Sequence, residues 1–208
     1  MSRLVILGAG GHAAVVAEAA MLMGRWSDIV FLDDTRDAGS DVLGHRVVDT
    51  TRNWTKFNQA KVDFFVAIGD NTARLGLLAD VQRNDGSVAN VVHPSATISR
   101  FAEIDSGVVV CAGAIVNPRA VIRDGSIVNT GATIDHDCEL GRGVHVSPGV
   151  HVAGGVRVGE RSWLGIGSSV REGVTIGDDV IVGAGAAVVS DVSPNSTVVG
   201  VPARPINE

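Results

Sequence analysis

One pattern of apolar positions covers almost half of this sequence: an aliphatic residue returns at every sixth position without interruption. The positions are Val92, Ile98, Ile104, Val110, Val116, Ile122, Val128, Ile134, Leu140, Val146, Val152, Val158, Leu164, Val170, Ile176, Val182 and Val188. A small or β-branched residue stands two positions before most of them, as at Ala114, Ala120 and Ala132. A helix repeats every 3.6 residues and a strand every two, so neither gives a period of six. Internal hexapeptide repeats predict a parallel β-helix, in which short strands wind around one axis and successive coils stack.

The first ninety residues follow a different pattern. Apolar runs predict strands at residues 4–7, 29–32 and 62–68, and helices are predicted at 13–23 and between 71 and 84. Alternating strands and helices indicate a small parallel α/β unit of the Rossmann type. We therefore expect an α/β domain at residues 1–91, followed by a β-helix domain with a C-terminal tail at residues 92–208.

Composition narrows the class of function. The net charge is −6 and the basic residues are dispersed, which argues against a nucleic-acid surface, since phosphate binding needs clustered Lys and Arg. No apolar run has the length of a membrane span and no cleavable leader is recognisable, so no membrane contact and a cytoplasmic location are expected. Cys111 and Cys138 occupy repeat positions, which predicts small core residues and no disulfide framework.

A glycine turn, Gly8-Ala9-Gly10-Gly11-His12, joins the first expected strand to the first expected helix. Glycines let a ligand approach the backbone, and the free N–H groups at a helix start attract phosphate oxygens. Ala13 stands where a dinucleotide fingerprint has its third glycine, so a mononucleotide-linked sugar is the better fit. Asp33 and Asp34, after the next strand, are candidates for hydrogen bonds to a ribose or base. A tight turn with no ligand is the alternative.

Several motifs together resemble a known family. The glycine turn, Phe31-Leu32-Asp33-Asp34, Ala67-Ile68-Gly69-Asp70-Asn71 and the hexapeptide register are similar to the PglD/NeuD-type nucleotide-sugar N-acetyltransferases of the hexapeptide-repeat acyltransferases. The resemblance implies a left-handed β-helix, acetyl-CoA as co-substrate, no metal, and a homotrimer with active sites at subunit interfaces. It further implies that Gly10, Gly11 and His12 lie at the substrate phosphates, that Asp33 and Asp34 lie near the nucleoside, and that Gly69 lies beside it.

One segment of the repeat is unusually polar, since His136 is flanked by Asp135 and Asp137. Acetyl transfer to an amine requires the amine to lose a proton, and an imidazole is suited to accept it. A carboxylate on the other ring nitrogen would fix the tautomer. We expect His136 to be the general base and favour Asp137 over Asp135 as its partner. A surface histidine in a charged turn is the alternative.

The resemblance also assigns residues around the acyl donor. His145 would contact acetyl-CoA, with Gly154, Gly183 and Ala184 lining its path. Asn129 would lie near the acceptor sugar or the reacting carbonyl. Tight corners also require small residues, so the sequence alone does not separate the two causes for Gly154, Gly183 and Ala184.

The expected function is therefore acetyl-CoA-dependent N-acetylation of a nucleotide-linked 4-amino-4,6-dideoxy sugar, with a UDP-linked sugar favoured, in the synthesis of surface glycans or glycoproteins. GDP- or dTDP-linked amino sugars, or O-acetylation of sialic acid, are alternatives. Two remoter alternatives are a zinc carbonic anhydrase that uses His136, His145 and His151 across an interface, and a trimeric scaffold without activity.

Overall fold

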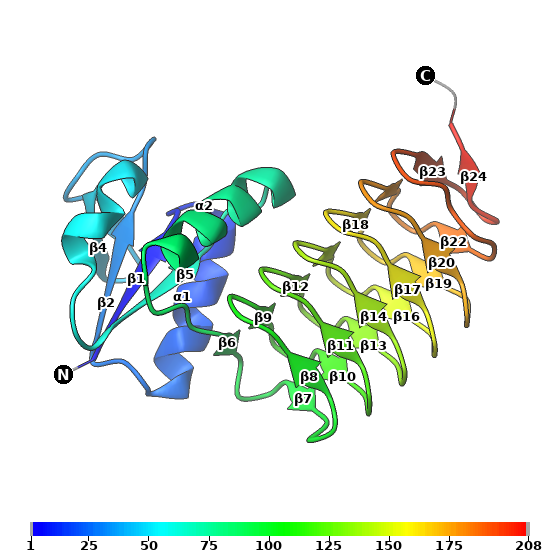
Figure 1. Cartoon of the computed structure of the whole chain (residues 1–208), viewed down its shortest axis with the longest axis horizontal. Helices are drawn as coiled ribbons and strands as arrows, with labels where there is room; N and C mark the ends of the chain where they lie inside the picture. Colours follow the sequence, from blue (N-terminus) through cyan, green and yellow to red (C-terminus); the bar gives the residue numbers. More distant parts are fainter. Residues whose placement is uncertain (1, 207–208) are drawn as a thin grey trace. The chain divides into compact units, whose positions relative to one another are not determined.

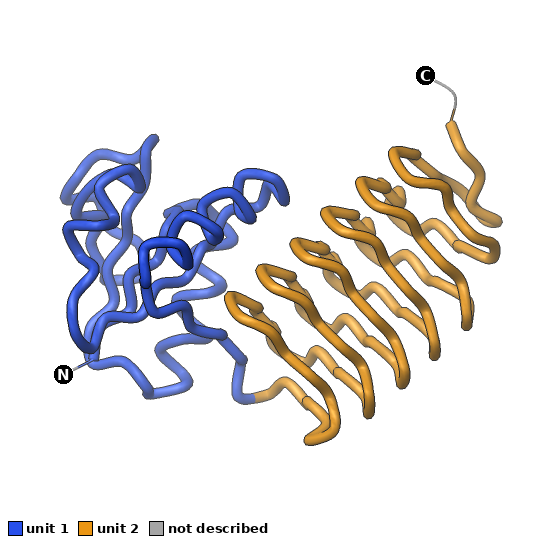
Figure 2. The backbone as a smooth tube through the Cα atoms, in the orientation of Figure 1, with its two compact units in different colours: residues 1–94 blue, residues 95–208 orange. Residues whose placement is uncertain are grey.

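The computed structural model describes residues 2–206, so residues 1, 207 and 208 of the two expected domains lie outside the described part. The chain divides into two compact units, residues 1–94 and residues 95–208 (Figure 2). From the sequence we expected this division between residues 91 and 92.

The first unit is built on a mostly parallel sheet in the order β3-β4-β2-β1-β5 (Figure 1). Its strands are β1 (Arg3–Leu7), β2 (Asp28–Leu32), β3 (Asp41–Val42), β4 (His45–Asp49) and β5 (Val62–Val66). The helices are α1 (Gly11–Met23), α2 (Asn71–Arg83) and the short 3-10 helix η1 (Thr51–Phe57). β1 is central, and residues 4–7 have no exposed surface, as expected for a parallel strand covered on both faces. The predicted Rossmann-like unit is confirmed.

The hairpin of β3 and β4 and the helix η1 were not predicted. β3 has only two residues, and Leu43 and Gly44, both at positive φ, form the turn between the strands. Two left-handed residues suit a tight hairpin turn. A two-residue strand carries no periodicity that a sequence pattern could detect. Val91–Val92 (β6) comes last in the sequence of this unit and is not part of its five-stranded sheet.

The second unit winds in coils of three short strands, and each face of the coil forms one parallel sheet (Figure 1). The first face contains β7 (Thr97–Ile98), β10 (Ile115–Val116), β13 (Thr133–Ile134), β16 (His151–Val152), β19 (Ser169–Val170) and β22 (Ala187–Val188). The second face contains β8 (Glu103–Ile104), β11 (Val121–Ile122), β14 (Glu139–Leu140), β17 (Arg157–Val158) and β20 (Thr175–Ile176). The third face contains β9 (Val109–Val110), β12 (Ile127–Val128), β15 (His145–Val146), β18 (Trp163–Leu164), β21 (Ile181–Val182) and β23 (Thr197–Val199), with β24 (Arg204–Pro205) antiparallel at its end.

The period-six register fills the interior of this prism. Each register residue is the second residue of its strand, and from Val116 to Val188 none of them is more than 3% exposed. Residues of adjacent coils pair 18 positions apart, as Ile115 does with Thr133, so each layer stacks on its equivalent in the next coil. Cys111 and Cys138 are 1% exposed, and burial raises the pKa of the Cys111 thiol to about 11, in keeping with the predicted core role. The β-helix is confirmed.

The corners of the prism need left-handed backbone. Positive φ recurs at every sixth residue from Gly107 to Gly185, and glycine occupies most of these positions because it adopts this conformation without strain. Four positions carry side chains instead: Arg119, Asp137, Arg161 and Asp179.

No helix among the described residues is both long enough and apolar enough to cross a membrane.

Candidate functional site

The glycine turn lies where the strand order of the first sheet reverses. β1 pairs with β2 on one side and with β5 on the other, and such a switch point is where open α/β sheets bind ligands. Gly8 is required by the fold, since its φ is +108° and a Cβ atom would stand 2.8 Å from the Ala67 carbonyl oxygen. Gly10, Gly11 and Gly69 have no positive φ, and a Cβ atom added to any of them would meet open space. The fold itself therefore does not explain these three glycines.

The two aspartates after β2 have partners within the chain. Asp33 Oδ2 accepts a hydrogen bond from the Ala9 amide at 2.7 Å, and Oδ1 accepts from Thr35 and Arg36. Although partial burial raises the pKa of Asp33, the hydrogen bonds from Thr35, Ala9 and Arg36 outweigh it and lower that pKa below its ordinary value. Asp34 accepts from the Thr51 hydroxyl at 2.5 Å. Asp33 thus holds the glycine turn in place, in addition to any role toward a nucleoside.

A buried arginine stands beside this turn, and sequence reasoning missed it. Arg74 in α2 is 1% exposed, and its guanidinium donates to the carbonyls of Ile68 and Gly69 and to Asn71 Oδ1 at 2.7–3.0 Å. Burial, with a smaller contribution from the Arg74 charge, lowers the pKa of His12 to about 4. His12 is therefore neutral near pH 7, while Arg74, whose pKa burial lowers to about 10, keeps its charge. The positive charge at the turn comes from Arg74.

In the second unit, His136 and Asp137 form a hydrogen-bonded pair at the corner between the first and second faces. His136 Nδ1 donates to Asp137 Oδ2 at 2.7 Å. Arg119, one coil earlier, contacts both oxygens of the same carboxylate, at 2.5 Å and 2.8 Å. The hydrogen bond and charge of Arg119, and then those of His136, hold the pKa of Asp137 well below its usual range. Asp137 is thus an ionised acceptor on one ring nitrogen.

The other candidate carboxylate points elsewhere. Asp135 Oδ1 accepts hydrogen bonds from the side-chain amide of Asn117 at 3.0 Å and from the His136 backbone amide at 2.8 Å. Within the described structure, the carboxylate on the His136 ring is the one that the sequence analysis favoured, Asp137.

Gly154 lies directly beneath the His136 ring. A Cβ atom on Gly154 would stand 2.6 Å from His136 Cε1 and 2.7 Å from Nε2. These distances are about 1 Å inside ordinary contact. The resemblance assigned Gly154 to acetyl-CoA, and the structure adds that this glycine makes room for the imidazole.

His145, Asn129, Gly183 and Ala184 line one cavity of about 520 Å³ on the third face and its corner with the first face. The His145 ring stacks on Trp163 with centroids 5.0 Å apart, and its Nε2 is 3.3 Å from Asn129 Nδ2. Trp163 Nε1 in turn donates to the Ser147 hydroxyl at 2.7 Å. The cavity is a mainly apolar groove with a few polar groups, which suits a thioester and its pantetheine arm. Sequence reasoning did not name Trp163.

The groove and His136 do not meet within one chain. His136 stands at the corner between β13 and β14, which is the corner opposite the third face of the three-sided coil. The groove belongs to β15, β18 and β21 of that third face. One prism therefore presents His136 and the groove on separate sides.

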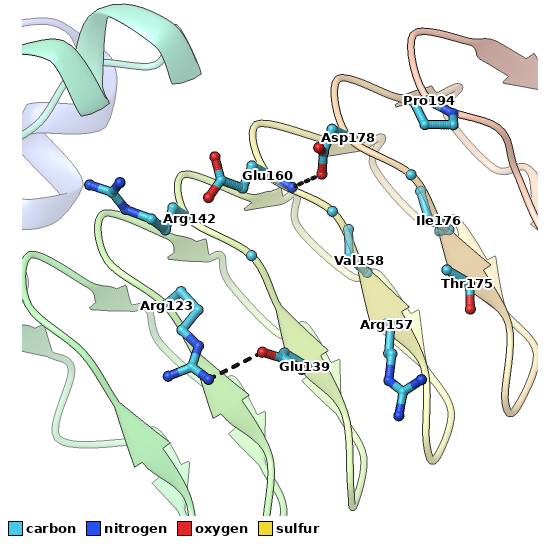
Figure 3. Close-up of a pocket in the computed structure, with 13 residues that line it drawn as sticks. Arg123, Glu139, Arg142, Arg157, Val158, Glu160, Thr175, Ile176, Asp178 and Pro194 are labelled. Atoms are coloured by element: carbon cyan, nitrogen blue, oxygen red, sulfur yellow. Dashed lines mark hydrogen bonds and ion pairs between the residues drawn. The ribbon is translucent and has the colours of Figure 1, made fainter.

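A second cavity, of about 510 Å³, lies on the second face (Figure 3). Arg123 reaches Glu139 at 3.2 Å, and the Glu160 amide donates to Asp178 at 2.8 Å (Figure 3). Gly141, Gly159 and Gly177 are among the residues that line it. These positions are glycine because a Cβ atom there would stand within 3.0 Å of the next coil. None of the predicted site residues lies in this cavity.

Both units of the chain match families of known proteins. The model of the PglD N-terminal domain matches residues 3–81, and the model of the bacterial transferase hexapeptide (six repeats) matches residues 155–189. The acetyltransferase domain of PglB from Neisseria gonorrhoeae, solved with acetyl coenzyme A, is 43% identical, with 98% of each chain covered and a TM-score of 0.95.

Two further structures are similar over the whole chain. A histidine variant of perosamine N-acetyltransferase from Caulobacter crescentus, solved with CoA and GDP-perosamine, is 42% identical, with 100% of this chain and 98% of that chain covered and a TM-score of 0.93. WeeI from Acinetobacter baumannii is 23% identical over 99% of this chain and 100% of that chain, with a TM-score of 0.91, and shows the shared fold. With full-length similarity above 40% and matches in both units, the chain belongs to the PglD-type acetyltransferases of the hexapeptide-repeat transferases.

Proposed function

We propose that this enzyme transfers the acetyl group of acetyl-CoA to the amine of a nucleotide-linked 4-amino-4,6-dideoxy sugar. The observation that carries the proposal is the full-length similarity to an N-acetyltransferase solved with CoA and GDP-perosamine. From the sequence we favoured a UDP-linked sugar, and this similarity supports a GDP-linked sugar equally well.

The His136–Asp137 pair supports direct transfer. With Nδ1 bonded to Asp137, Nε2 is the nitrogen that accepts a proton. The sugar amine attacks the thioester carbonyl carbon, the new C–N bond forms, and the amine proton passes to His136 Nε2. Collapse of the tetrahedral intermediate breaks the C–S bond, and the proton on His136 goes to the departing thiolate to give free CoA.

The groove on the third face supports acetyl-CoA binding. Stacking on Trp163 and the contact with Asn129 hold the His145 ring at the wall of the groove. Because His145 Nε2 accepts from the Asn129 amide, the second hydrogen on Asn129 Nδ2 is the one that can reach the thioester oxygen as negative charge develops on it. Small residues at Gly183 and Ala184 leave the groove open for the pantetheine arm.

A second copy of the chain completes the site in this proposal. Because the base and the groove lie on separate sides of one prism, His136 of one copy would face the groove of its neighbour. A closed ring of three copies makes three identical seams of this kind. Cyclic symmetry therefore fits the geometry, and we propose a homotrimer.

The switch point of the first unit supports nucleotide-sugar binding. Gly10 and Gly11 at the start of α1, and Gly69 shortly before α2, leave free space that the fold does not need. Backbone amides there attract a diphosphate, and the buried Arg74 adds a positive charge. His12, held neutral by burial, would contribute as a neutral hydrogen-bonding group.

A substrate panel tests the function. The full chain is incubated with acetyl-CoA and UDP-, GDP- and dTDP-linked 4-amino-4,6-dideoxy sugars, and free thiol release is followed. We expect release with one nucleotide series, and a product heavier by one acetyl group in mass spectrometry. The matching 4-hydroxy sugars are the control. Thiol release with the hydroxy sugars alone would indicate O-acetylation, and no release with any amino sugar would overturn the proposal.

The variant Gly11→Ala tests whether this position is glycine because the ligand approaches it or because the fold requires it. The new methyl group enters open space at the first position of α1, so the free energy of unfolding should rise by about 0.5–1 kcal/mol while the KM for the nucleotide sugar rises about tenfold. Gly76→Ala in α2 is the matched control, because Gly76 also has open space and lies within a helix. It should gain similar stability with an unchanged KM. Steady-state kinetics measures KM, and thermal unfolding measures stability. Equal KM values for both variants would contradict phosphate binding at the turn.

A further inference from the structure

Arg119 shares a carboxylate with the proposed base. Its Nε and Nη2 atoms contact Oδ1 and Oδ2 of Asp137, and Oδ2 is also the atom that accepts from His136 Nδ1. Arg119 and Asp137 both stand at left-handed corners, with φ of 61° and 60°. They are 18 positions apart, so the stacking of coils brings them to the same corner, and Asp137 donates its backbone amide to the Pro118 carbonyl beside Arg119.

The chain contains an internal duplicate of this pair. Arg161 and Asp179 also stand at left-handed corners 18 positions apart, and Arg161 contacts both oxygens of Asp179 at 2.8 Å and 2.6 Å. Asp178, the residue before Asp179, binds the Glu160 backbone amide, whereas the residue before Asp137 is the histidine. A corner pair of this kind can therefore exist without a histidine, and only the first pair carries an imidazole.

The bidentate contact has a chemical consequence. The Asp137 side chain is 44% exposed, and alone it could rotate away or accept a proton. A planar guanidinium fixes the plane of a carboxylate through two parallel hydrogen bonds. An ionised carboxylate only accepts hydrogen bonds, so His136 must carry its proton on Nδ1 and leave the Nε2 lone pair for the substrate.

We propose that Arg119 is a positioning residue for acetyl transfer, which holds Asp137 so that Asp137 holds the His136 ring in the reactive tautomer and orientation. The inference rests on the proposed function of His136 as the base. Arg119 acts through Asp137 and has no contact with the reacting atoms in this scheme. An ion pair this exposed adds little to stability, so its loss should leave the fold intact.

The test compares Arg119→Met with Arg161→Met in the full chain. Each change removes one corner guanidinium and places a residue of similar length at the same positive φ. We expect Arg119→Met to lower kcat about 10–100-fold with KM values nearly unchanged, and Arg161→Met to keep the wild-type kcat. Added guanidinium should restore part of the activity of Arg119→Ala. A raised KM for either substrate with an unchanged kcat would instead show direct substrate binding by Arg119 and overturn the inference, as would an equal loss in both variants.

A second measurement does not depend on the substrate. Nitrogen NMR of histidine-labelled protein reports the tautomer of His136, assigned by loss of its signals in His136→Asn. We expect a Nδ1–H tautomer in the wild type and a mixture of tautomers in Arg119→Met. An unchanged spectrum would overturn the inference even if the substrate remains unknown, whereas a wild type inactive toward every amino sugar would overturn only the proposed function.

Discussion

Replacing His136 with asparagine is expected to lower kcat for acetyl transfer by about 10²–10⁴-fold, the range that a positioned general base contributes. The side chains have similar size, and His136 is 57% exposed, so the fold should tolerate the change. Asparagine has no nitrogen that accepts a proton near pH 7, so the amine would have to lose its proton to water. Stopped assays of product formation across pH measure the effect.

The control separates chemistry from binding of the acyl donor. Trp163, at 43% exposed, lines the groove, whereas Trp26 and Trp54 are at most 7% exposed, so a fluorescence change on adding acetyl-CoA should report the groove. His136→Asn should keep this change while losing turnover. His45→Asn, at a histidine without a predicted role, should keep both. Wild-type turnover in His136→Asn would remove His136 as the base and favour a different mechanism of acetyl transfer.

The β-helix could be predicted because its core residues follow a short-range repeat in the sequence. Each register residue lies six positions from the next and fills an equivalent layer, so no distant pairing has to be guessed. The α/β unit was predicted for a similar reason: the apolar run at 4–7 and the glycine turn after it identify a buried strand and the helix that follows. The boundaries of α1 and α2 lie within two residues of the expected ones.

The candidate site was only partly predictable. His136 could be found because its charged neighbours interrupt an apolar repeat, but its contact with Arg119 depends on coils of 18 residues. A signal was present: arginine and aspartate stand 18 positions apart at glycine corner positions, twice in one chain. The burial of Arg74 had no such signal, because a charged residue in a short helix is ordinarily expected at the protein surface. Its buried guanidinium is satisfied by the carbonyls of Ile68 and Gly69, which follow β5 in the sequence.

Gly154 has a steric relation to His136 that its expected role beside acetyl-CoA did not include. Sequence similarity placed this glycine beside acetyl-CoA, and tight corners offered a second explanation. The structure adds a third, because the Gly154 Cα lies beneath the His136 ring and a methyl group there would overlap Cε1 and Nε2. The same stacking of coils that packs the core therefore also shapes the surface beneath the proposed base.

Gly154→Ala is expected to lower kcat about 10²-fold while the protein stays folded. The added methyl group would lie 2.6 Å from His136 Cε1, so the ring must move by about 1 Å, which breaks its alignment with Asp137. Displacements of this size typically cost about 10²-fold in rate. The ring is the far end of an exposed side chain and can yield, unlike the backbone that surrounds Gly165, where a Cβ would stand 2.5 Å from the Val182 carbonyl oxygen.

A double-mutant cycle identifies the route of this effect. If Gly154 acts through the imidazole alone, the variant His136→Asn with Gly154→Ala should be no slower than His136→Asn, because the group that the methyl displaces is already absent. Thermal unfolding of Gly154→Ala should match the wild type closely, and Gly165→Ala should unfold at a lower temperature. If Gly154→Ala instead raised the KM for acetyl-CoA at an unchanged kcat, the glycine would serve the acyl donor, as the sequence comparison first implied. Additive losses in the double variant would likewise show that the methyl group acts on something other than the His136 ring.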